Sequence, residues 1–419
     1  MTGDTIRRAV DGFHAEQVRF LAELVRAPSD NPPGDCTPHA RRTAMLLREL
    51  GFSVEEHPVP AHDVQAHGML TATNLIVRRR FGPGPIIALN AHGDVVPPGE
   101  GWTTDPYGAE IRAGVLYGRG AAVSKSDIAT YAFALKALER CARPLAGQVE
   151  LHITYDEETG GLVGPHWLLQ QGLTHPDYAI CAGFSYNIVI AHNGCLHLEV
   201  RVQGRSAHAA RPETGVDALE AATELLNGLY ALRRTYGTVH SHIPGIDHPT
   251  LVVGLIKGGI NTNVVPDVVT LSLDRRIIPE EDPETAEREL QRAIEQVAAR
   301  LPGVRVSVRR ILLARPLTPS AAQEPLVRAI QHHAQAVLGE AIPANGVPIY
   351  TDARHYSAAG IPTVLYGAGP RTLLEANAHR ADERVSLEDL RMATEVVALS
   401  LADLLRDSAA SAGAACDCR

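Results

Sequence analysis

Histidines and carboxylates stand at the ends of two apolar segments of this sequence, in the combination that metal-assisted hydrolysis uses. His92 and Asp94 follow the first apolar run directly, and Glu157 and Glu158 follow the second. A further histidine, His379, lies near the C-terminus. Imidazole nitrogens and carboxylate oxygens are the usual ligands of catalytic zinc, and a free carboxylate beside them can accept a proton from water. These residues therefore predict a site where a divalent metal activates water.

The composition is that of an ordinary globular protein of enzyme size. The 419 residues exceed what one typical core holds, so two domains are expected, and the apolar and charged contents are 45% and 21%. A formal net charge of −9 argues against nucleic acid or an anionic membrane as the partner. We expect a cytoplasmic location, because no apolar stretch approaches the ~20 residues that span a bilayer and the N-terminus lacks a signal-peptide pattern.

The part of the chain that carries the first four site residues alternates between strand and helix patterns. Strands are expected at 53–59, 74–79, 85–91, 149–155 and 178–182, with helices at 127–140 and 163–171. Most of these strands are almost continuously apolar, which is typical of strands buried on both faces. The pattern indicates an α/β domain whose mixed sheet is covered by helices on both sides.

A different pattern begins at Gly194, where apolar and polar residues alternate. The expected elements are strand 196–202, helix 216–234, strands 251–257 and 268–277, helix 283–300 and strand 304–311. This order is the ferredoxin-like split motif. Buried strands and helices return afterwards. We therefore expect a discontinuous α/β catalytic domain, residues 1–193 and 314–419, interrupted by an inserted α+β domain at 194–313.

Seven segments of the chain, in the expected order, resemble the M20 family of metallopeptidases and aminoacylases. The segments are 92–95, 101–121, 156–160, 204–209, 258–266, 351–354 and 378–379. The resemblance extends over almost the whole chain and is to the group of succinyl-diaminopimelate desuccinylase, acetylornithine deacetylase, carboxypeptidase G and aminoacylase-1. It implies a homodimeric amidohydrolase for an N-acyl amino acid or a small peptide-like amide, with the inserted domain serving as the dimerisation and lid domain.

The resemblance also implies a role for each site residue of the α/β domain. His92, Glu158 and His379 would bind the metal, and two histidines with one carboxylate and an open position are a sufficient set for zinc or manganese. Glu157 would be the general base. Asp94 would fix the tautomer of the His92 imidazole.

Three further residues are implied in substrate contacts. His208, in the inserted domain, would reach across the dimer and stabilise the oxyanion, and Asn263 would bind the substrate beside it. Arg354 would make a bidentate contact with a substrate carboxylate, although an ion pair with Asp352 is an equal alternative for this arginine.

Two positions depart from the family pattern. Val123 stands where the family has a carboxylate that bridges two metals, and Gly183 stands where it has a further glutamate ligand. Two unbridged dications about 3.5 Å apart would repel by about 19 kcal/mol even at an effective dielectric of about 20. We therefore expect one divalent metal, zinc or manganese, in place of two. Asp127, Tyr186 and His192 lie near the lost positions and are the alternatives for a replacement ligand.

The leading functional prediction is hydrolysis of the amide of an N-acyl amino acid or a small peptide-like substrate at a mononuclear or otherwise modified metal site. One alternative is hydrolysis of another C–N bond, such as a deamination. A second alternative is a degenerate family member that binds small amides without turnover. The presence of Glu157 argues against this last alternative, because a pure binding protein gains little from a general base.

Overall fold

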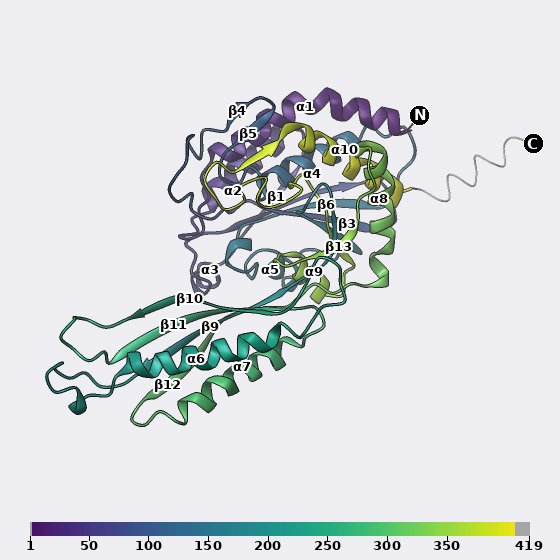
Figure 1. Ribbon diagram of the computed structural model, residues 1–419. Helices are drawn as coiled ribbons and strands as arrows, with labels where there is room; N and C mark the ends of the chain where they lie inside the picture. The colour runs from purple at the N-terminus through teal and green to yellow at the C-terminus, as the bar shows by residue number, and fades with distance from the viewer. Residues whose placement is uncertain (1, 407–419) are drawn as a thin grey trace, which may run out of the picture. The chain divides into compact units, whose positions relative to one another are not determined.

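The computed structural model describes residues 2–406, which form two compact units (Figure 1). Unit 1 contains residues 2–190, 319–345 and 351–406. Unit 2 contains residues 191–318 and 346–350. The chain is a mixed α/β protein with one large mixed sheet, so the predicted fold class is confirmed at this level. Within residues 2–406, no helix combines the length and the apolar sequence needed to cross a membrane.

The large sheet has eight strands and determines where the site residues lie. In order across the sheet they are β1 (Val54–Pro58), β2 (Thr73–Arg80), β6 (Gln148–Thr154), β3 (Ile86–His92), β7 (Tyr178–Cys181), β14 (Thr363–Leu365), β8 (Ile188–His192) and β13 (Ala344–Val347). The four neighbouring strands β6, β3, β7 and β14 run parallel to one another. Parallel strands end at the same edge, so the residues that follow these four strands are brought together there.

Helices cover both faces of this sheet, so nearly all residues of its central strands β3 and β6 are buried. The helix α4 (Lys125–Leu138) packs on β3 and β6, and it contacts α1 (Thr2–Arg26) and α10 (Leu387–Leu404) on its outer side. Every residue of α4 except Lys136 is therefore buried. The short helix α9 (Ala353–Ala358) packs on β7 and β14. Figure 1 shows α1, α4 and α10 on one side of the sheet and α5 (Pro165–Gln170) and α9 on the other.

Unit 1 also contains a small sheet and further helices, among them the 3₁₀ helix η3 (Ala321–Gln323). The others are α2 (Thr37–Glu49), α3 (Ala61–Ala66), β4 (Glu110–Arg112), β5 (Val115–Tyr117), the 3₁₀ helix η1 (Glu157–Thr159), α8 (Glu324–Leu338) and β15 (Arg384–Ser386). The strands β15, β5 and β4 form a separate three-stranded sheet. The sequence patterns did not predict these short strands, because three residues are too few to show a hydrophobic period.

Unit 2 has the element order strand, helix, strand, strand, helix, strand. Its elements are β9 (Gly194–Gln203), α6 (Ala218–Tyr236), β10 (Thr250–Gly258), β11 (Val268–Ile277), α7 (Pro283–Ala298) and β12 (Arg305–Ala314). The sheet is antiparallel with strand order β10-β11-β9-β12. Alternate residues of β9, from Leu196 to Val202, form one core with α6 and α7. The intervening residues of β9 therefore point to the opposite face.

A buried polar network fixes β6 to its neighbours. The Glu150 carboxylate accepts hydrogen bonds from Thr174 Oγ1 at 2.5 Å and from Arg78, and it lies 2.9 Å from His152 Nε2. The other ring nitrogen of His152 lies 2.8 Å from the hydroxyl of Tyr356 on α9. Burial opposes ionisation of Glu150, but His152, Thr174 and Arg78 together hold its pKa at about 2. The ionised carboxylate therefore stabilises the strand that leads to Glu157.

Replacing Glu150 by Gln is expected to destabilise unit 1 in a pH-dependent way. The folded-state pKa lies below the ordinary value of 4.5, so this stabilisation is present above pH ~4.5 and is lost as the pH falls toward 2. The difference in the free energy of unfolding should be about 3 kcal/mol at pH 7 and should shrink through that window. Urea unfolding at several pH values measures it. Glu55→Gln, which removes an exposed partner of the same Arg78, is the control and should cost less than about 1 kcal/mol. A difference that does not change with pH would contradict the assignment.

Candidate metal and catalytic site

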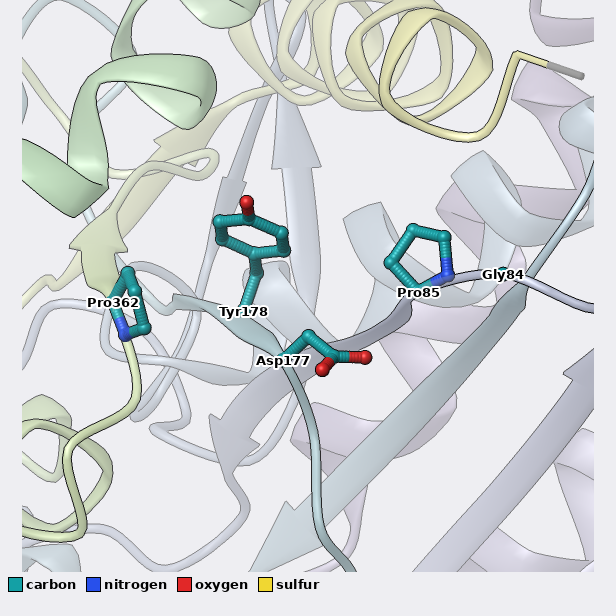
Figure 2. Close-up of a pocket in the computed structure, with 5 residues that line it drawn as sticks. All are labelled: Gly84, Pro85, Asp177, Tyr178 and Pro362. Atoms are coloured by element: carbon teal, nitrogen blue, oxygen red, sulfur yellow. The ribbon is translucent and has the colours of Figure 1, made fainter. Parts of the chain in front are cut away.

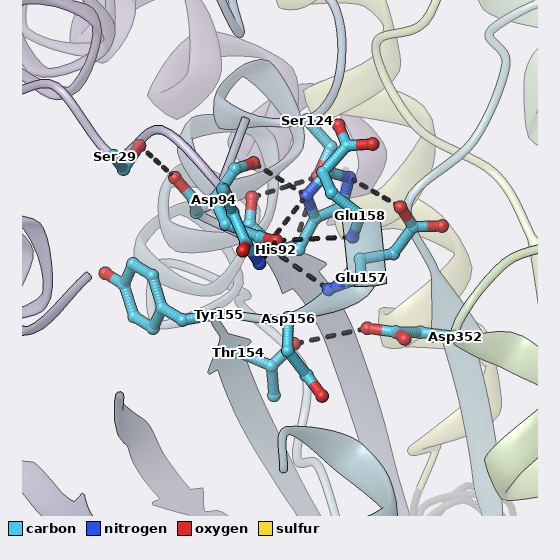
Figure 3. Close-up of polar contacts among 12 residues, drawn as sticks. Ser29, His92, Asp94, Ser124, Thr154, Tyr155, Asp156, Glu157, Glu158 and Asp352 are labelled. Atoms are coloured by element: carbon cyan, nitrogen blue, oxygen red, sulfur yellow. Dashed lines mark hydrogen bonds and ion pairs between the residues drawn. The ribbon is translucent and has the colours of Figure 1, made fainter. Parts of the chain in front are cut away.

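Three potential metal ligands meet where β3 and β6 end (Figure 3). His92 is the last residue of β3, and Glu157 and Glu158 begin η1, which follows β6. One ligand atom from each of the three lies within 4.8 Å of the other two, and His92 Nε2 is 3.9 Å from Glu157 Oε2. The side chains of Glu157 and Glu158 are 15% and 7% exposed. The cluster is thus largely shielded from water, and Glu157 is its more exposed carboxylate.

Asp94 holds this cluster together. Its backbone oxygen and its Oδ1 lie 3.0 Å and 3.4 Å from His92 Nδ1, and its two carboxylate oxygens accept the backbone N–H groups of Glu157 and Glu158 at 3.3 Å and 3.2 Å. Both neighbours of Nδ1 are acceptors, so the proton of the neutral imidazole is assigned to Nδ1 and Nε2 faces the acidic pair. Asn31 Nδ2 donates to the same carboxylate at 3.0 Å. Sequence reasoning identified Asp94 but missed Asn31, since no motif surrounds that asparagine.

His379 approaches the cluster through Glu158. Its Nε2 lies 3.2 Å from Glu158 Oε1, and the contact with Glu158 raises the pKa of the imidazole above its ordinary value. The side chain is 51% exposed, and the backbone has a positive φ of 60°, which is uncommon for a histidine. The structure thus brings His92, Glu157 and Glu158 into one group and places His379 at its rim, in contact with one member.

The charges at this edge of the sheet favour a bound cation. Burial, with the neighbouring carboxylates of Glu158, Asp352 and Asp94, raises the pKa of Glu157 well above its ordinary range, and only His92 opposes this. Burial also raises the pKa of Asp352 to about 7. Glu158 Oε1 is buried and makes no hydrogen bond of good geometry. Imidazole and carboxylate donors in a group with surplus negative charge are the donor set that a divalent metal requires, so these residues fit such an ion.

The loop that contains Val123 is held by a buried ion pair. Glu383 Oε1 accepts the backbone N–H groups of Ala122 and Val123 at 3.0 Å and 3.1 Å, and Glu383 Oε2 lies 2.6 Å from Arg119 Nη1. The side chains of Arg119 and Glu383 are 1% and 0% exposed. Sequence reasoning missed Glu383. The sequence gives only an indirect sign of this glutamate. Arg119 lies within a motif next to buried strands, and a buried guanidinium needs a carboxylate partner somewhere in the chain.

The three alternative ligands have contacts of other kinds. Asp127 is buried on α4, and its Oδ1 accepts the backbone N–H of Ala368 at 2.8 Å. Tyr186 donates from its hydroxyl to Asp389 at 2.7 Å. His192 Nδ1 lies 2.9 Å from the backbone oxygen of Asn193. In residues 2–406, the metal-ligand group at this edge of the sheet includes none of the three.

Arg354 is buried beside the loop that follows η1. It is 6% exposed and donates from Nη2 to the carbonyl oxygen of Gly160, while His355 Nε2 lies 3.0 Å from the same oxygen. A Cβ at the next residue, Gly161, would lie 2.2 Å from Asp352 Oδ1, so glycine allows the loop to pack tightly against α9. These contacts support the loop that carries the acidic pair, a role that neither sequence alternative for Arg354 included.

His208 and Asn263 belong to unit 2 and are both exposed. Their loops pair through an isolated bridge between His208 and Val264 and through a 2.9 Å hydrogen bond from Ala209 N to Asn263 O. Ala210 N donates to His208 Nδ1 at 3.0 Å. A donor at Nδ1 assigns the proton of the neutral ring to Nε2, so this nitrogen is able to donate to a ligand.

A hollow lies at the opposite edge of the large sheet from this cluster (Figure 2). It has a volume of about 480 Å³ and is lined by Gly84, Pro85, Asp177, Tyr178 and Pro362. These residues precede or begin β3, β7 and β14, so they lie where the parallel strands start. The Asp177 carboxylate accepts the backbone N–H of Ile86 at 2.8 Å. This hollow is therefore separate from the cluster that carries the chemistry.

Comparisons of this chain with known proteins all indicate the same family. The model of peptidase family M20/M25/M40 matches residues 88–403. A succinyl-diaminopimelate desuccinylase from Gluconacetobacter diazotrophicus is 31% identical over 91% of this chain and 95% of its own, and an acetylornithine deacetylase from Pectobacterium carotovorum is 32% identical over 68% and 74%. The fold resembles an M20 metallo-carboxypeptidase from Sulfolobus solfataricus, with a TM-score of 0.77 at 18% identity over 93% and 99% of the two chains. It also resembles a Bacillus subtilis M20 peptidase described as binding a dinuclear metal, with a TM-score of 0.66 at 18% identity over 94% and 99%.

Placing a carboxylate at position 183 is expected to damage the fold without adding a ligand. Any Cβ on Gly183 would lie 2.8 Å from backbone atoms of Leu365, the last residue of β14, and of Tyr366, which follows it. Gly183→Glu and its control Gly183→Ala should both lower the free energy of unfolding by about 1–3 kcal/mol, as overpacking does. Denaturant unfolding and metal analysis measure the two effects. A Gly183→Glu variant as stable as the unmodified protein, with increased metal content, would contradict this interpretation.

Proposed function

This chain belongs to peptidase family M20/M25/M40, and we propose that it is a metal-dependent amidohydrolase that cleaves N-acyl amino acids or small peptide-like amides. Membership of the family makes it a hydrolase of C–N bonds. The observation that carries the specific proposal is the cluster of His92, Glu157 and Glu158, organised by Asp94 at the carboxyl edge of the parallel strands. The two curated relatives are named for removing an acetyl and a succinyl group, and we extend that class of substrate to this chain.

We assign the metal to His92 and Glu158, with His379 as the third ligand. A divalent ion there would polarise the substrate carbonyl and lower the pKa of a water molecule. Glu157 lies beside these ligands and remains partly exposed, so it is placed to take a proton from the water and later to donate it to the leaving amine. Asp94 keeps the His92 ring oriented and holds the backbone of the acidic pair through both carboxylate oxygens.

We propose that the site holds one tightly bound metal. Val123 and Gly183 remove two anionic ligands of the family pattern, and the carboxylate of Asp127 already accepts a backbone hydrogen bond. A second dication would lack a bridging anion to offset the repulsion between the ions. In this respect the chain would differ from the Bacillus subtilis relative described as dinuclear.

The general-base role is tested by Glu157→Gln. The amide has nearly the same shape but does not accept a proton, so turnover of an N-acyl amino acid should fall by at least ~10²-fold. Metal content and the free energy of unfolding should stay close to those of the unmodified protein. Glu158→Gln is the matched control, because it should lose metal as well as activity. Turnover at the original rate in Glu157→Gln would remove this residue from the mechanism.

The single-metal proposal is tested by Val123→Asp. The substitution returns a carboxylate to the expected bridging position, where Glu383 already holds the backbone, so metal affinity or stoichiometry should rise. Val123→Asn has similar volume without charge and should leave both unchanged. Elemental analysis of the purified proteins gives the stoichiometry. Two tightly bound metals per unmodified chain would refute the proposal.

We also propose a homodimer formed through unit 2. The strand β10 is at the edge of its sheet and exposes Val252, Leu255 and Ile256, which are 50%, 69% and 57% exposed. An apolar edge strand with unpaired backbone groups is a surface that natural proteins usually cover. In such a dimer, His208 of one chain would donate from Nε2 to the oxyanion formed in the other, with Asn263 beside it.

Mixing two inactive variants tests this shared site. His208→Ala and Glu157→Gln chains should each be inactive alone, but a mixed dimer would contain one intact site. Equal amounts that exchange freely should regain about a quarter of the original activity, because half of the dimers are mixed and each has one working site of two. Activity no greater than the sum of the separate variants, or a fully active monomer, would exclude the shared site.

A further inference from the structure

Three metal-ligating side chains that the proposed hydrolytic site does not use meet on the sheet of unit 2. Cys195 and His197 are two residues apart on β9, and Asp274 on β11 is the register partner of His197. One ligand atom from each lies within 4.8 Å of the other two. Leu196, between the first two, packs into the core with α6 and α7, so Cys195 and His197 point to the opposite face of the sheet.

The distances are close to those between ligands of a tetrahedral metal site, and the two contacts reach different oxygens of Asp274. Cys195 Sγ lies 3.7 Å from Asp274 Oδ1, and His197 Nε2 lies 3.2 Å from Asp274 Oδ2. Bonds from zinc of about 2.3 Å to sulfur and about 2.0 Å to nitrogen or oxygen separate such ligand atoms by about 3.3–3.6 Å. Paired strands hold all three residues, so little movement is needed to bind an ion.

The burial of the three side chains leaves room for solvent ligands. Cys195 is fully buried, whereas the side chains of His197 and Asp274 are 32% and 30% exposed. A cation among them would have protein on one side and a position open to water on the other.

A cation bound to these three side chains would be repelled by the positive charge of Arg276. Its guanidinium donates to both oxygens of Asp274, at 3.0 Å and 3.2 Å. Burial opposes ionisation of Asp274, but His197 and Arg276 hold its pKa below the ordinary range. An ionised carboxylate has about four acceptor positions, so Asp274 is able to keep contact with Arg276 while it binds an ion. A thiolate and a carboxylate together neutralise a dication.

We propose that Cys195, His197 and Asp274 form a second metal site, for a thiophilic divalent cation of the zinc class. Thiolate and imidazole ligands select such ions over magnesium and calcium. Binding releases the thiol proton of Cys195 to solvent and forms the metal–sulfur bond. The ion joins β9 to β11 and stabilises the folded chain by mass action, whether or not the hydrolytic proposal is correct.

Cobalt(II) distinguishes this site from the hydrolytic one, because only a thiolate ligand gives a sulfur-to-metal charge-transfer band in the near ultraviolet. The full chain is stripped of metal and titrated with Co²⁺. In every sample Cys416 and Cys418, which lie outside the described residues, are replaced by Ser. The band should appear, be displaced by Zn²⁺, and persist in His92→Ala, which removes a ligand of the hydrolytic site. It should vanish in Cys195→Ser and remain in Cys141→Ser, the matched control.

Two further variants keep the test decisive if Cys195→Ser folds poorly. His197→Ala should weaken Co²⁺ binding at this site by at least about tenfold, and Arg276→Gln should tighten it, because a competing positive charge is removed. Circular dichroism checks the fold of each variant. The absence of the band in the parent protein at saturating Co²⁺, or its persistence in folded Cys195→Ser, would overturn the proposal.

Discussion

The candidate site depends on a single carboxylate, that of Asp94. It is fully buried, and it contacts the imidazole of His92 on one strand and the backbone N–H groups of Glu157 and Glu158 after another. One side chain thus sets the ring orientation of a ligand and the position of the acidic pair together. The parallel strands β3 and β6 make this possible, because their ends lie at the same edge of the sheet. The hydrogen bond from Asn31 keeps the carboxylate itself in place.

The same arrangement concentrates negative charge at one point. Burial and repulsion from neighbouring carboxylates raise the pKa of Glu157 and Asp352. Ionisation of these acids is therefore unfavourable unless a cation is bound beside them. Val123 and Gly183 add no negative charge to this group. The surroundings of Gly183 are filled by the backbone of β14, and those of the Val123 loop are fixed by Glu383. The packing around Gly183 thus leaves no room for a side chain at that position.

The two faces of the sheet in unit 2 carry different kinds of side chain. One face packs on α6 and α7 and forms an apolar core, and the other carries polar side chains such as His197 and Asp274. Its exposed loops bring His208 and Asn263 together through a short backbone pairing. The strand alternation that stabilises this unit therefore also determines which side chains are available for binding.

The sequence by itself determined the mixed α/β fold and the central strands of the sheet, since continuous apolar runs bounded by glycine and polar residues allow few other structures. It also predicted His92, Glu157 and Glu158 as site residues, because ligand types at strand ends form a local pattern, and the structure brings the three together. The tertiary structure alone decided which distant groups support them. Glu383 reaches the Val123 loop across 260 residues of chain, and Arg354 reaches Gly160 across 194. Such contacts follow from strand order and helix packing, which bring remote segments together without leaving a periodic signal in either segment.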